Sequence, residues 1–208
     1  TYGNGEKGIY TMVSYSDVDL FLLDDRSWRS EDRTPSTVNG QPNSEKTMLG
    51  REQLNWLKQA LRFSRASFKI IVVGSQVLNP VSPYDKVLDF PAEYYELMEF
   101  IREEKIEGIL FFTGDRHHSE VIKVQHEGLY PLYDVTCSPL SSGTHKFGGP
   151  EAINPYRVFG LDQYQNYGLI QSSGARNERK MQVEFVGPKG ELFGTWSVHQ
   201  KELKIPKQ

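Results

Sequence analysis

Two short runs, Lys69-Ile70-Ile71-Val72-Val73-Gly74 and Ile109-Leu110-Phe111-Phe112-Thr113, decide the predicted fold. Each holds four consecutive apolar residues, which is typical of strands buried on both faces of a parallel sheet. A segment with helical periodicity, residues 91–105, lies between the two runs, and a second, residues 51–64, precedes them. This alternation of helices and strands with short links predicts α/β layers.

The spacing of apolar side chains predicts both helices. Residues 51–64 place one apolar stripe at positions i, i+3 and i+7, made of Leu54, Leu57 and Leu61. Residues 91–105 begin with Pro91, which suits a first helical turn because its missing N–H needs no partner there. Asp89, just before it, is a candidate capping residue.

The remaining segments predict antiparallel hairpins and loops. Residues 9–14 and 18–24 flank a Ser16-Asp17 turn and predict a hairpin. Five further strand-like runs follow in the second half, at residues 121–125, 132–136, 168–172, 181–186 and 192–198. The polar segment 29–46 and the Gly/Pro-rich segment 138–163 are predicted to be loops. The predicted fold class is therefore α/β (α+β), with antiparallel hairpins in the C-terminal half.

The composition excludes several classes of protein. The 208 residues include 24 Lys and Arg scattered among 27 Asp and Glu, so there is no basic block typical of a nucleic-acid scaffold. The apolar runs are too short to span a bilayer. One cysteine, Cys137, excludes an internal disulfide framework. The chain does not begin with Met, and Thr1–Gly5 resembles the interior of a longer protein, so we expect an upstream segment.

The first candidate site is Gly114-Asp115-Arg116-His117-His118, directly after an apolar strand. Open α/β sheets bind ligands beyond the carboxyl ends of their strands, and a carboxylate and an imidazole two residues apart can point into one crevice. Oxygen and nitrogen ligands suit iron, manganese or zinc, and the carboxylate also suits calcium or magnesium. The alternative is a turn followed by two surface histidines.

A second candidate is Asp24-Asp25-Arg26-Ser27-Trp28-Arg29, which also follows an apolar strand. Its two arginines, three residues apart, could clamp a phosphate, or the segment could be a surface ion-pair cluster. A third candidate, Cys137 to Gly143, is a small-residue turn that could form an anion-binding nest or a pocket wall. Neither Ser141 nor Ser142 is surrounded by the Gly-x-Ser-x-Gly elbow of a serine nucleophile.

Taken in order, four motifs resemble the PhoD-like alkaline phosphatase/phosphodiesterase branch of the calcineurin-like metallophosphoesterases. They are Leu22–Arg29, Met48–Leu57 with its Leu-Gly-x-x-Gln-x-x-Trp-Leu pattern, Gly114–Ser119 and Ser138–Gly143. The resemblance covers about residues 8–200. It implies a four-layer αββα sandwich with a metal cluster between its sheets. The implied activity is metal-dependent hydrolysis of phosphate mono- or diesters, small substrates attacked by a metal-bound hydroxide.

The resemblance also implies roles for individual residues. Asp115 and His117 match metal ligands of the family, and the implied metals are iron and calcium. His118 is a candidate catalytic residue that assists the leaving group, or a further ligand. Arg26 matches a family arginine and is inferred to bind the substrate phosphate. The neighbouring Asp25 stands where a small residue such as Thr is commoner. The implied location is extracytoplasmic, periplasmic or secreted.

The family's upstream metal-binding elements do not occur in this sequence. Residues 1–208 therefore match the C-terminal portion of one catalytic domain and carry only half of its metal site. Two or three ligands cannot hold two ions, so we expect this chain alone to be inactive, or a second polypeptide to supply the missing half. Two other readings stay open: a non-catalytic α/β binding module that lost its metal site, and an esterase that uses Ser141.

Overall fold

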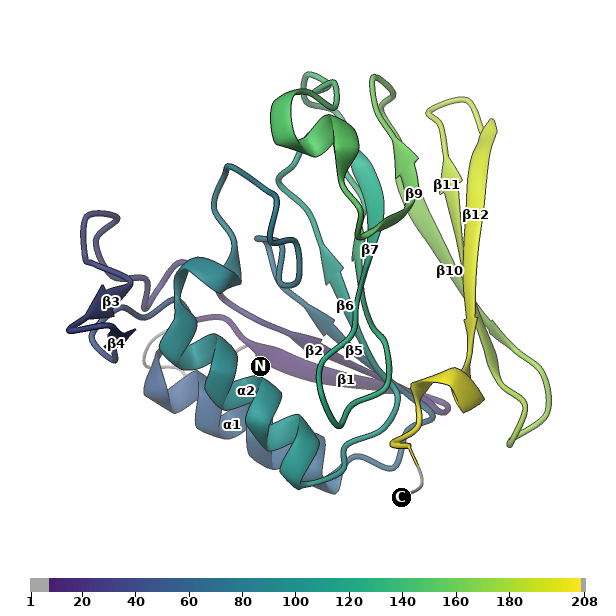
Figure 1. The fold of residues 1–208 in the computed structure, drawn as a ribbon. Helices are drawn as coiled ribbons and strands as arrows, with labels where there is room; N and C mark the ends of the chain where they lie inside the picture. The colour runs from purple at the N-terminus through teal and green to yellow at the C-terminus, as the bar shows by residue number, and fades with distance from the viewer. Residues whose placement is uncertain (1–7, 207–208) are drawn as a thin grey trace.

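The computed structural model describes residues 8–206 and places seven strands in one sheet, in the order β1-β2-β5-β6-β8-β7-β9. In that order the strands are Thr11–Tyr15, Val18–Leu22, Phe68–Val72, Ile109–Thr113, Leu132–Thr136, Ser119–Val124 and Arg157–Leu161. Helices α1 (Gly50–Phe63) and α2 (Pro91–Glu103) cover one face of this sheet (Figure 1).

A second, antiparallel sheet covers part of the other face (Figure 1). It consists of β10 (Tyr167–Ser173), β11 (Lys180–Val186) and β12 (Leu192–His199). Aromatic contacts join the two sheets. The ring centroids of Tyr133 and Trp196 are 5.0 Å apart, and Phe159 stacks on Phe185 with ring centroids 4.3 Å apart. The described residues thus form three layers, and the fourth layer of the αββα sandwich stays a prediction.

The middle of the large sheet is parallel, as the two apolar runs predict. β2 pairs with β5, β5 with β6, and β6 with β8, all in parallel. The predicted hairpin β1–β2 is antiparallel, and β7 pairs antiparallel with both β8 and β9. The α/β (α+β) class is confirmed, because a parallel centre is flanked by antiparallel strands.

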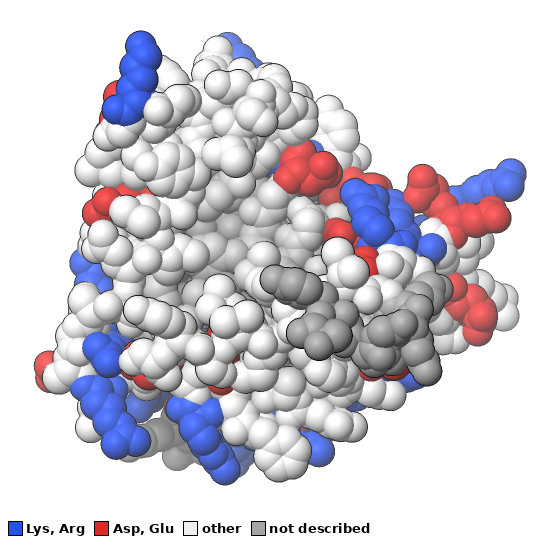
Figure 2. Space-filling model, turned by 180° about the vertical axis from the view of Figure 1, so that it is seen from behind, with Lys and Arg blue, Asp and Glu red and all other residues white. Residues whose placement is uncertain are grey.

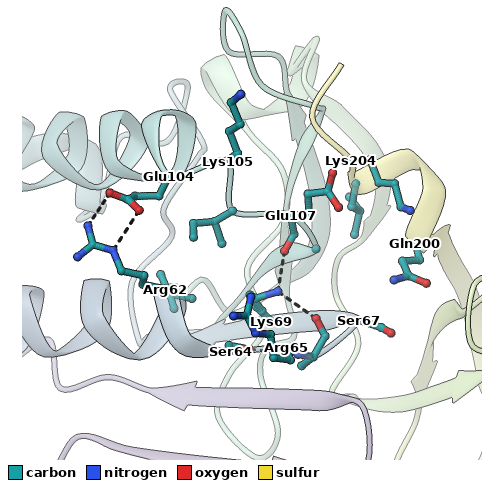
Figure 3. A pocket seen from close by; sticks show the side chains of 15 residues that line it. Arg62, Ser64, Arg65, Ser67, Lys69, Glu104, Lys105, Glu107, Gln200 and Lys204 are labelled. Atoms are coloured by element: carbon teal, nitrogen blue, oxygen red, sulfur yellow. Dashed lines mark hydrogen bonds and ion pairs between the residues drawn. The ribbon is translucent and has the colours of Figure 1, made fainter. Parts of the chain in front are cut away.

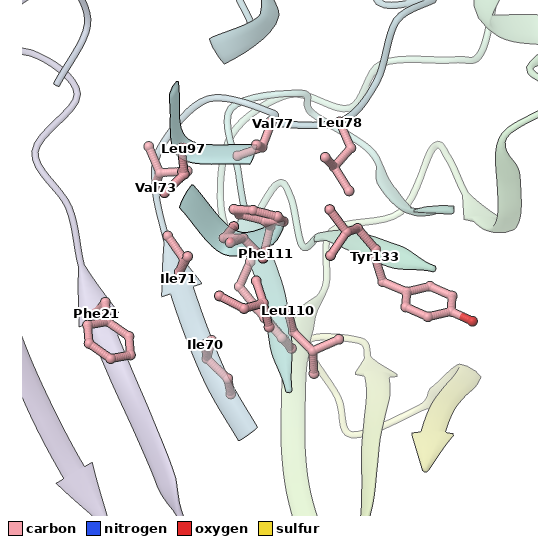
Figure 4. Close-up of a cluster of buried hydrophobic side chains, with 14 of the residues drawn as sticks. Phe21, Ile70, Ile71, Val73, Val77, Leu78, Leu97, Leu110, Phe111 and Tyr133 are labelled. Carbon is pink, nitrogen blue, oxygen red and sulfur yellow. The ribbon is translucent and has the colours of Figure 1, made fainter. Parts of the chain in front are cut away.

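The core lies between the helices and the parallel strands. The predicted α1 stripe is completely buried, as are the strand residues Ile70, Ile71, Leu110 and Phe111. Figure 4 shows these strand side chains gathered with Phe21 of β2 and Leu97 of α2. Burial on both faces explains why β5 and β6 are continuously apolar.

Neither helix is capped at its N-terminus by a side chain of its own N-cap residue. Among the residues described, no side chain caps α2, and Asp89 instead pairs with Lys86 at 3.0 Å, so the capping prediction for Asp89 is wrong. α1 receives its cap from α2. The carboxylate of Glu93 accepts hydrogen bonds from the backbone N–H groups of Met48, Leu49 and Gly50 at 2.7, 2.9 and 2.7 Å.

Both predicted loops contain strands. Residues 29–46 include the small hairpin β3 (Thr37–Val38) and β4 (Gln41–Pro42). Residues 138–163 include the short helix η2 (Gly149–Ile153) and the edge strand β9. β9 escapes sequence patterning because it is half exposed and interrupted by Gly160, and its pairing comes only from the edge of β7.

Two further short helices are present, η1 (Val87–Asp89) and η3 (Gln200–Leu203). Within residues 8–206, neither helix α1 nor α2 nor any shorter one is both long and apolar enough to cross a membrane. The segment Thr1–Gly5, expected to continue from an upstream part, lies outside the described residues.

Candidate active site

The two principal motifs meet where the parallel strands end. The N–H of Gly114, after β6, donates to the carbonyl of Gly74, after β5, at 3.1 Å. The carboxylate of Asp25, in the segment after β2, packs against Gly74. A Cβ atom added at Gly74 would lie only 2.8 Å from Asp25 Oδ2, so no larger residue fits there without a shift. Cys137, after β8, donates its N–H to the carbonyl of Thr113 at 3.0 Å. The loops that follow β2, β5, β6 and β8 therefore begin side by side.

The Gly114–His118 turn has an unusual backbone. Asp115 and His117 have φ values of +63° and +57°, in the left-handed region that residues with a side chain rarely adopt. The turn is held by hydrogen bonds on both sides of His117. Its N–H donates to Ser138 Oγ at 3.0 Å, and its carbonyl accepts from the N–H of His145 at 2.7 Å. Such backbone strain persists where surrounding contacts hold it, and it is frequent at functional sites.

This backbone alternates the side chains between solvent and interior. Asp115 and His117 are exposed, whereas Arg116 and His118 are buried. Within residues 8–206, Asp115 forms no side-chain hydrogen bond or ion pair, and His117 has only a 3.5 Å contact with Ser142 Oγ. An oxygen and a nitrogen donor thus stand on the open side of the turn.

The buried residues anchor the turn from beneath. Arg116 forms an ion pair with Glu151, and its guanidinium lies 4.4 Å from the ring centroid of Tyr84. His118 is 0% exposed, and its Nε2 lies 3.2 Å from Glu120 Oε1. Its side chain therefore lies beneath the turn, and its catalytic role stays a prediction.

Glu120 is the centre of this buried network. Its carboxylate accepts hydrogen bonds from Gln76 at 2.8 Å, Asn79 at 3.0 Å and Arg157 at 2.7 Å, besides the contact with His118. Burial alone would raise the pKa of Glu120, but these partners outweigh it and lower the pKa to about 2. Glu120 is therefore a charged, fully satisfied group at neutral pH.

His118, Glu120 and Glu151 also bring three possible metal-ligating atoms within 4.8 Å of one another. His118 Nδ1 is buried with no hydrogen-bond partner in the described part of the chain. Each carboxylate, however, already faces an arginine, Arg157 for Glu120 and Arg116 for Glu151. A divalent ion would have to displace these arginines, since the local charges are already balanced. Among residues 8–206, no arginine or lysine forms an ion pair with the exposed Asp115 beside His117.

The two arginines of the second motif, Arg26 and Arg29, differ in how far their guanidinium groups are already paired with carboxylates. Arg29 is committed to Asp32 and Asp85, at 2.8 and 2.9 Å, and does not clamp a ligand together with Arg26. The Arg26 side chain is 61% exposed, and its one ion pair within residues 8–206 is a long 3.9 Å contact with Asp25. Asp25 itself is buried and accepts from the N–H and Oγ of Ser75, both at 2.9 Å. Of these two arginines, Arg26 is therefore the one whose guanidinium is left available for a ligand.

The serine-rich turn after β8 has a supporting role. Ser138 is buried and fixes the backbone of His117, as described above. Ser141 is exposed and forms no side-chain hydrogen bond within the described chain. A serine nucleophile needs an adjacent base, so this arrangement gives no support to an esterase that uses Ser141.

Several supporting residues were not predicted from the sequence. Asp134 of β8 is completely buried and accepts from the N–H groups of Val77 and Leu78 and from Thr113 Oγ1, at 2.7, 2.9 and 2.7 Å. Burial raises its pKa to about 6, despite these hydrogen bonds. The sequence did carry a sign of these residues. Asp134 and Glu120 are acidic residues inside apolar strand runs, and acidic side chains are almost never buried unless they have specific partners.

Comparison with known proteins agrees with this architecture. A family model described as PhoD-like phosphatase matches residues 2–157. Alkaline phosphatase D of Bacillus subtilis (strain 168) is 26% identical over 127 residues, which are 53% of this chain and 21% of that protein. A solved structure of PhoD covers 96% of this chain with a TM-score of 0.66 at 18% identity, which shows the shared fold.

The chain spans 44% of that solved PhoD chain and a smaller share, 21%, of the Bacillus protein. The family match covers most of the described chain, including both strand-end motifs. The family relationship indicates binding of divalent metal. This chain belongs to the PhoD-like phosphatase family.

Proposed function

We propose that this chain forms part of an enzyme that hydrolyses small phosphate mono- or diesters with the help of metal ions. The observation that carries the proposal is the Gly114–His118 turn, which holds Asp115 and His117 in strained conformations at adjoining strand ends. Left-handed residues of this kind cluster at functional sites, where surrounding contacts hold them.

In this proposal Asp115 and His117 are metal ligands. Their donor atoms fit the implied metals, since a carboxylate oxygen suits calcium and an imidazole nitrogen suits iron. A metal ion bound there would polarise a phosphoryl oxygen and lower the pKa of a coordinated water. Two side chains cannot complete the coordination of two ions. We therefore propose that other ligands come from outside these 208 residues, in the same polypeptide or in a second one.

Arg26 is proposed to bind the substrate phosphate. Its exposed guanidinium follows β2, two strands from β6 with β5 between them, at the same end of the parallel strands as the Gly114–His118 turn. A guanidinium can donate two parallel hydrogen bonds to phosphoryl oxygens. His118 is proposed as a positioning residue that holds the turn through Glu120. An extracytoplasmic location is also proposed, and it rests on the family relationship alone.

The test uses full-length protein purified without chelator. We expect it to contain bound iron and calcium, measured by elemental analysis, and to hydrolyse a chromogenic phosphodiester. Asp115→Asn should abolish turnover and lower the metal content while circular dichroism stays unchanged. Glu127→Gln, in the exposed turn after β7, is the matched control and should retain activity.

Full activity in the Asp115→Asn variant would refute the assignment of this residue as a ligand. Metal-free, inactive wild-type protein would instead support the non-catalytic binding module.

A further inference from the structure

A polar cavity of about 320 Å³ lies at the opposite end of the parallel strands from the candidate active site. Its walls come from three segments, residues 61–69, 104–108 and 200–204, where α1 and α2 end and η3 closes the chain against them (Figure 3). Because the strands separate it from Asp115 and His117, the cavity is independent of the proposed hydrolytic site.

Lys69 forms part of the cavity floor. It is only 7% exposed, and its Nζ donates to the backbone carbonyls of Ala66 and Glu107, both at 3.0 Å. No carboxylate in residues 8–206 accepts a hydrogen bond from this ammonium group, although Asp19 and Glu107 attract it through space. Burial lowers the pKa of Lys69 accordingly. One of its three N–H groups is still without an acceptor in the described chain.

The other charges around the cavity are mostly positive. Arg62 and Glu104 form an ion pair with each other and offset their charges. The remaining charged lining residues are four cations and one carboxylate, namely Arg65, Lys69, Lys105, Lys204 and Glu107. This excess is local, because the whole chain has a net charge of -3. In Figure 2, several basic side chains lie at the lower end of the molecule.

One polar atom of the cavity wall also lacks a hydrogen-bond partner among the described residues. Gln200 Oε1 is buried without a hydrogen-bond partner among the residues described. Figure 3 shows Gln200 and Lys204 on one wall, Lys69 and Arg65 on the floor, and the Lys105 side chain directed away from the centre. Buried polar atoms without a partner are rare, and each points to a missing ligand or water.

We propose that this cavity is a binding site for a small, multiply charged oxyanion of the phosphate type. Lys69 and Arg65 line it from residues 61–69 and Lys204 lines it from residues 200–204, so donors stand on two sides of the space, as a tetrahedral anion with four oxygens requires. The volume is near the lower end of small-molecule sites, ~300–1,000 Å³, which favours a small ligand.

Inorganic phosphate is the probe for the test, with the 208-residue chain in a buffer free of other oxyanions. Isothermal titration calorimetry should show saturable binding, and the midpoint of thermal unfolding should rise with phosphate concentration. Arg65→Ala and Lys204→Ala should each weaken binding by about tenfold, equivalent to ~1.4 kcal/mol. Both side chains lie at the surface end of the cavity, so these variants should fold normally by circular dichroism.

Two control variants locate the site. Lys123→Ala, at an exposed position of the otherwise mostly buried β7, should bind phosphate as the wild type does. Arg26→Ala should also bind normally, which separates this cavity from the proposed hydrolytic site. The proposal is overturned if Arg26→Ala abolishes binding while Arg65→Ala and Lys204→Ala retain it, or if the wild type does not bind phosphate at all. Sulfate should compete with phosphate, and equal competition by acetate would refute selectivity for a multiply charged oxyanion.

Discussion

The cap that α2 provides for α1 gives a prediction that can be worked out in detail. Glu93 accepts three backbone hydrogen bonds from residues 48–50, and it is nearly completely buried. In Glu93→Gln the side chain keeps one carbonyl oxygen and presents an NH₂ group to these donors. One or two N–H groups therefore lose their acceptor in a dry environment, at ~1–3 kcal/mol each. We expect the free energy of unfolding to fall by ~2–4 kcal/mol.

The assay is urea unfolding of the chain, followed by circular dichroism and tryptophan fluorescence. A loss of ~3 kcal/mol corresponds to a decrease in Tm of roughly 6–12 °C for a chain of this size. The slope of the unfolding free energy against urea should not change, since the same surface is exposed. Glu99→Gln is the matched control on α2. It removes only an exposed ion pair with Arg102 and should change stability by less than ~0.5 kcal/mol. A Glu93→Gln variant as stable as Glu99→Gln would refute the reasoning.

Two further predictions concern the candidate site. The pKa of Asp134 is raised from 3.8 to about 6, so the folded chain binds this proton more tightly than the unfolded chain. Its contribution to stability is therefore largest below pH ~4 and falls by ~3 kcal/mol as the pH rises through 6. Asp134→Asn should remove this decline from a plot of Tm against pH between 4 and 7, and an identical decline in the variant would contradict it. Separately, His117→Gly should relieve a left-handed conformation and leave the chain as stable as the wild type or up to ~1 kcal/mol more stable, while metal content falls. Urea unfolding measures the first effect and elemental analysis the second, and a destabilised His117→Gly chain would show that the turn is not strained.

The site itself was only partly accessible to sequence reasoning. The position of Gly114–His118 after an apolar strand was enough to place this motif at a strand end, and the order of the four motifs indicated the family. The burial of His118 could not be foreseen, because two adjacent histidines look equivalent until the backbone at His117 turns one inward and one outward. The pairing of Arg29 with Asp85 was equally hidden, since the two residues are 56 positions apart.

The sequence by itself determined the features that depend on neighbouring residues: the apolar stripe of α1, the continuous burial of β5 and β6, and the chemistry of the Asp115 and His117 side chains. Helical and strand periodicities are local, so a single segment is enough to reveal them. Only the tertiary structure decided which charged groups are satisfied. Glu93 caps a helix more than forty positions away, Glu120 meets Gln76 and Arg157, and Lys69 is buried beside a cavity built from three segments. Hydrogen-bond partners and burial depend on segments that meet only when the chain folds, so one stretch of sequence cannot determine them.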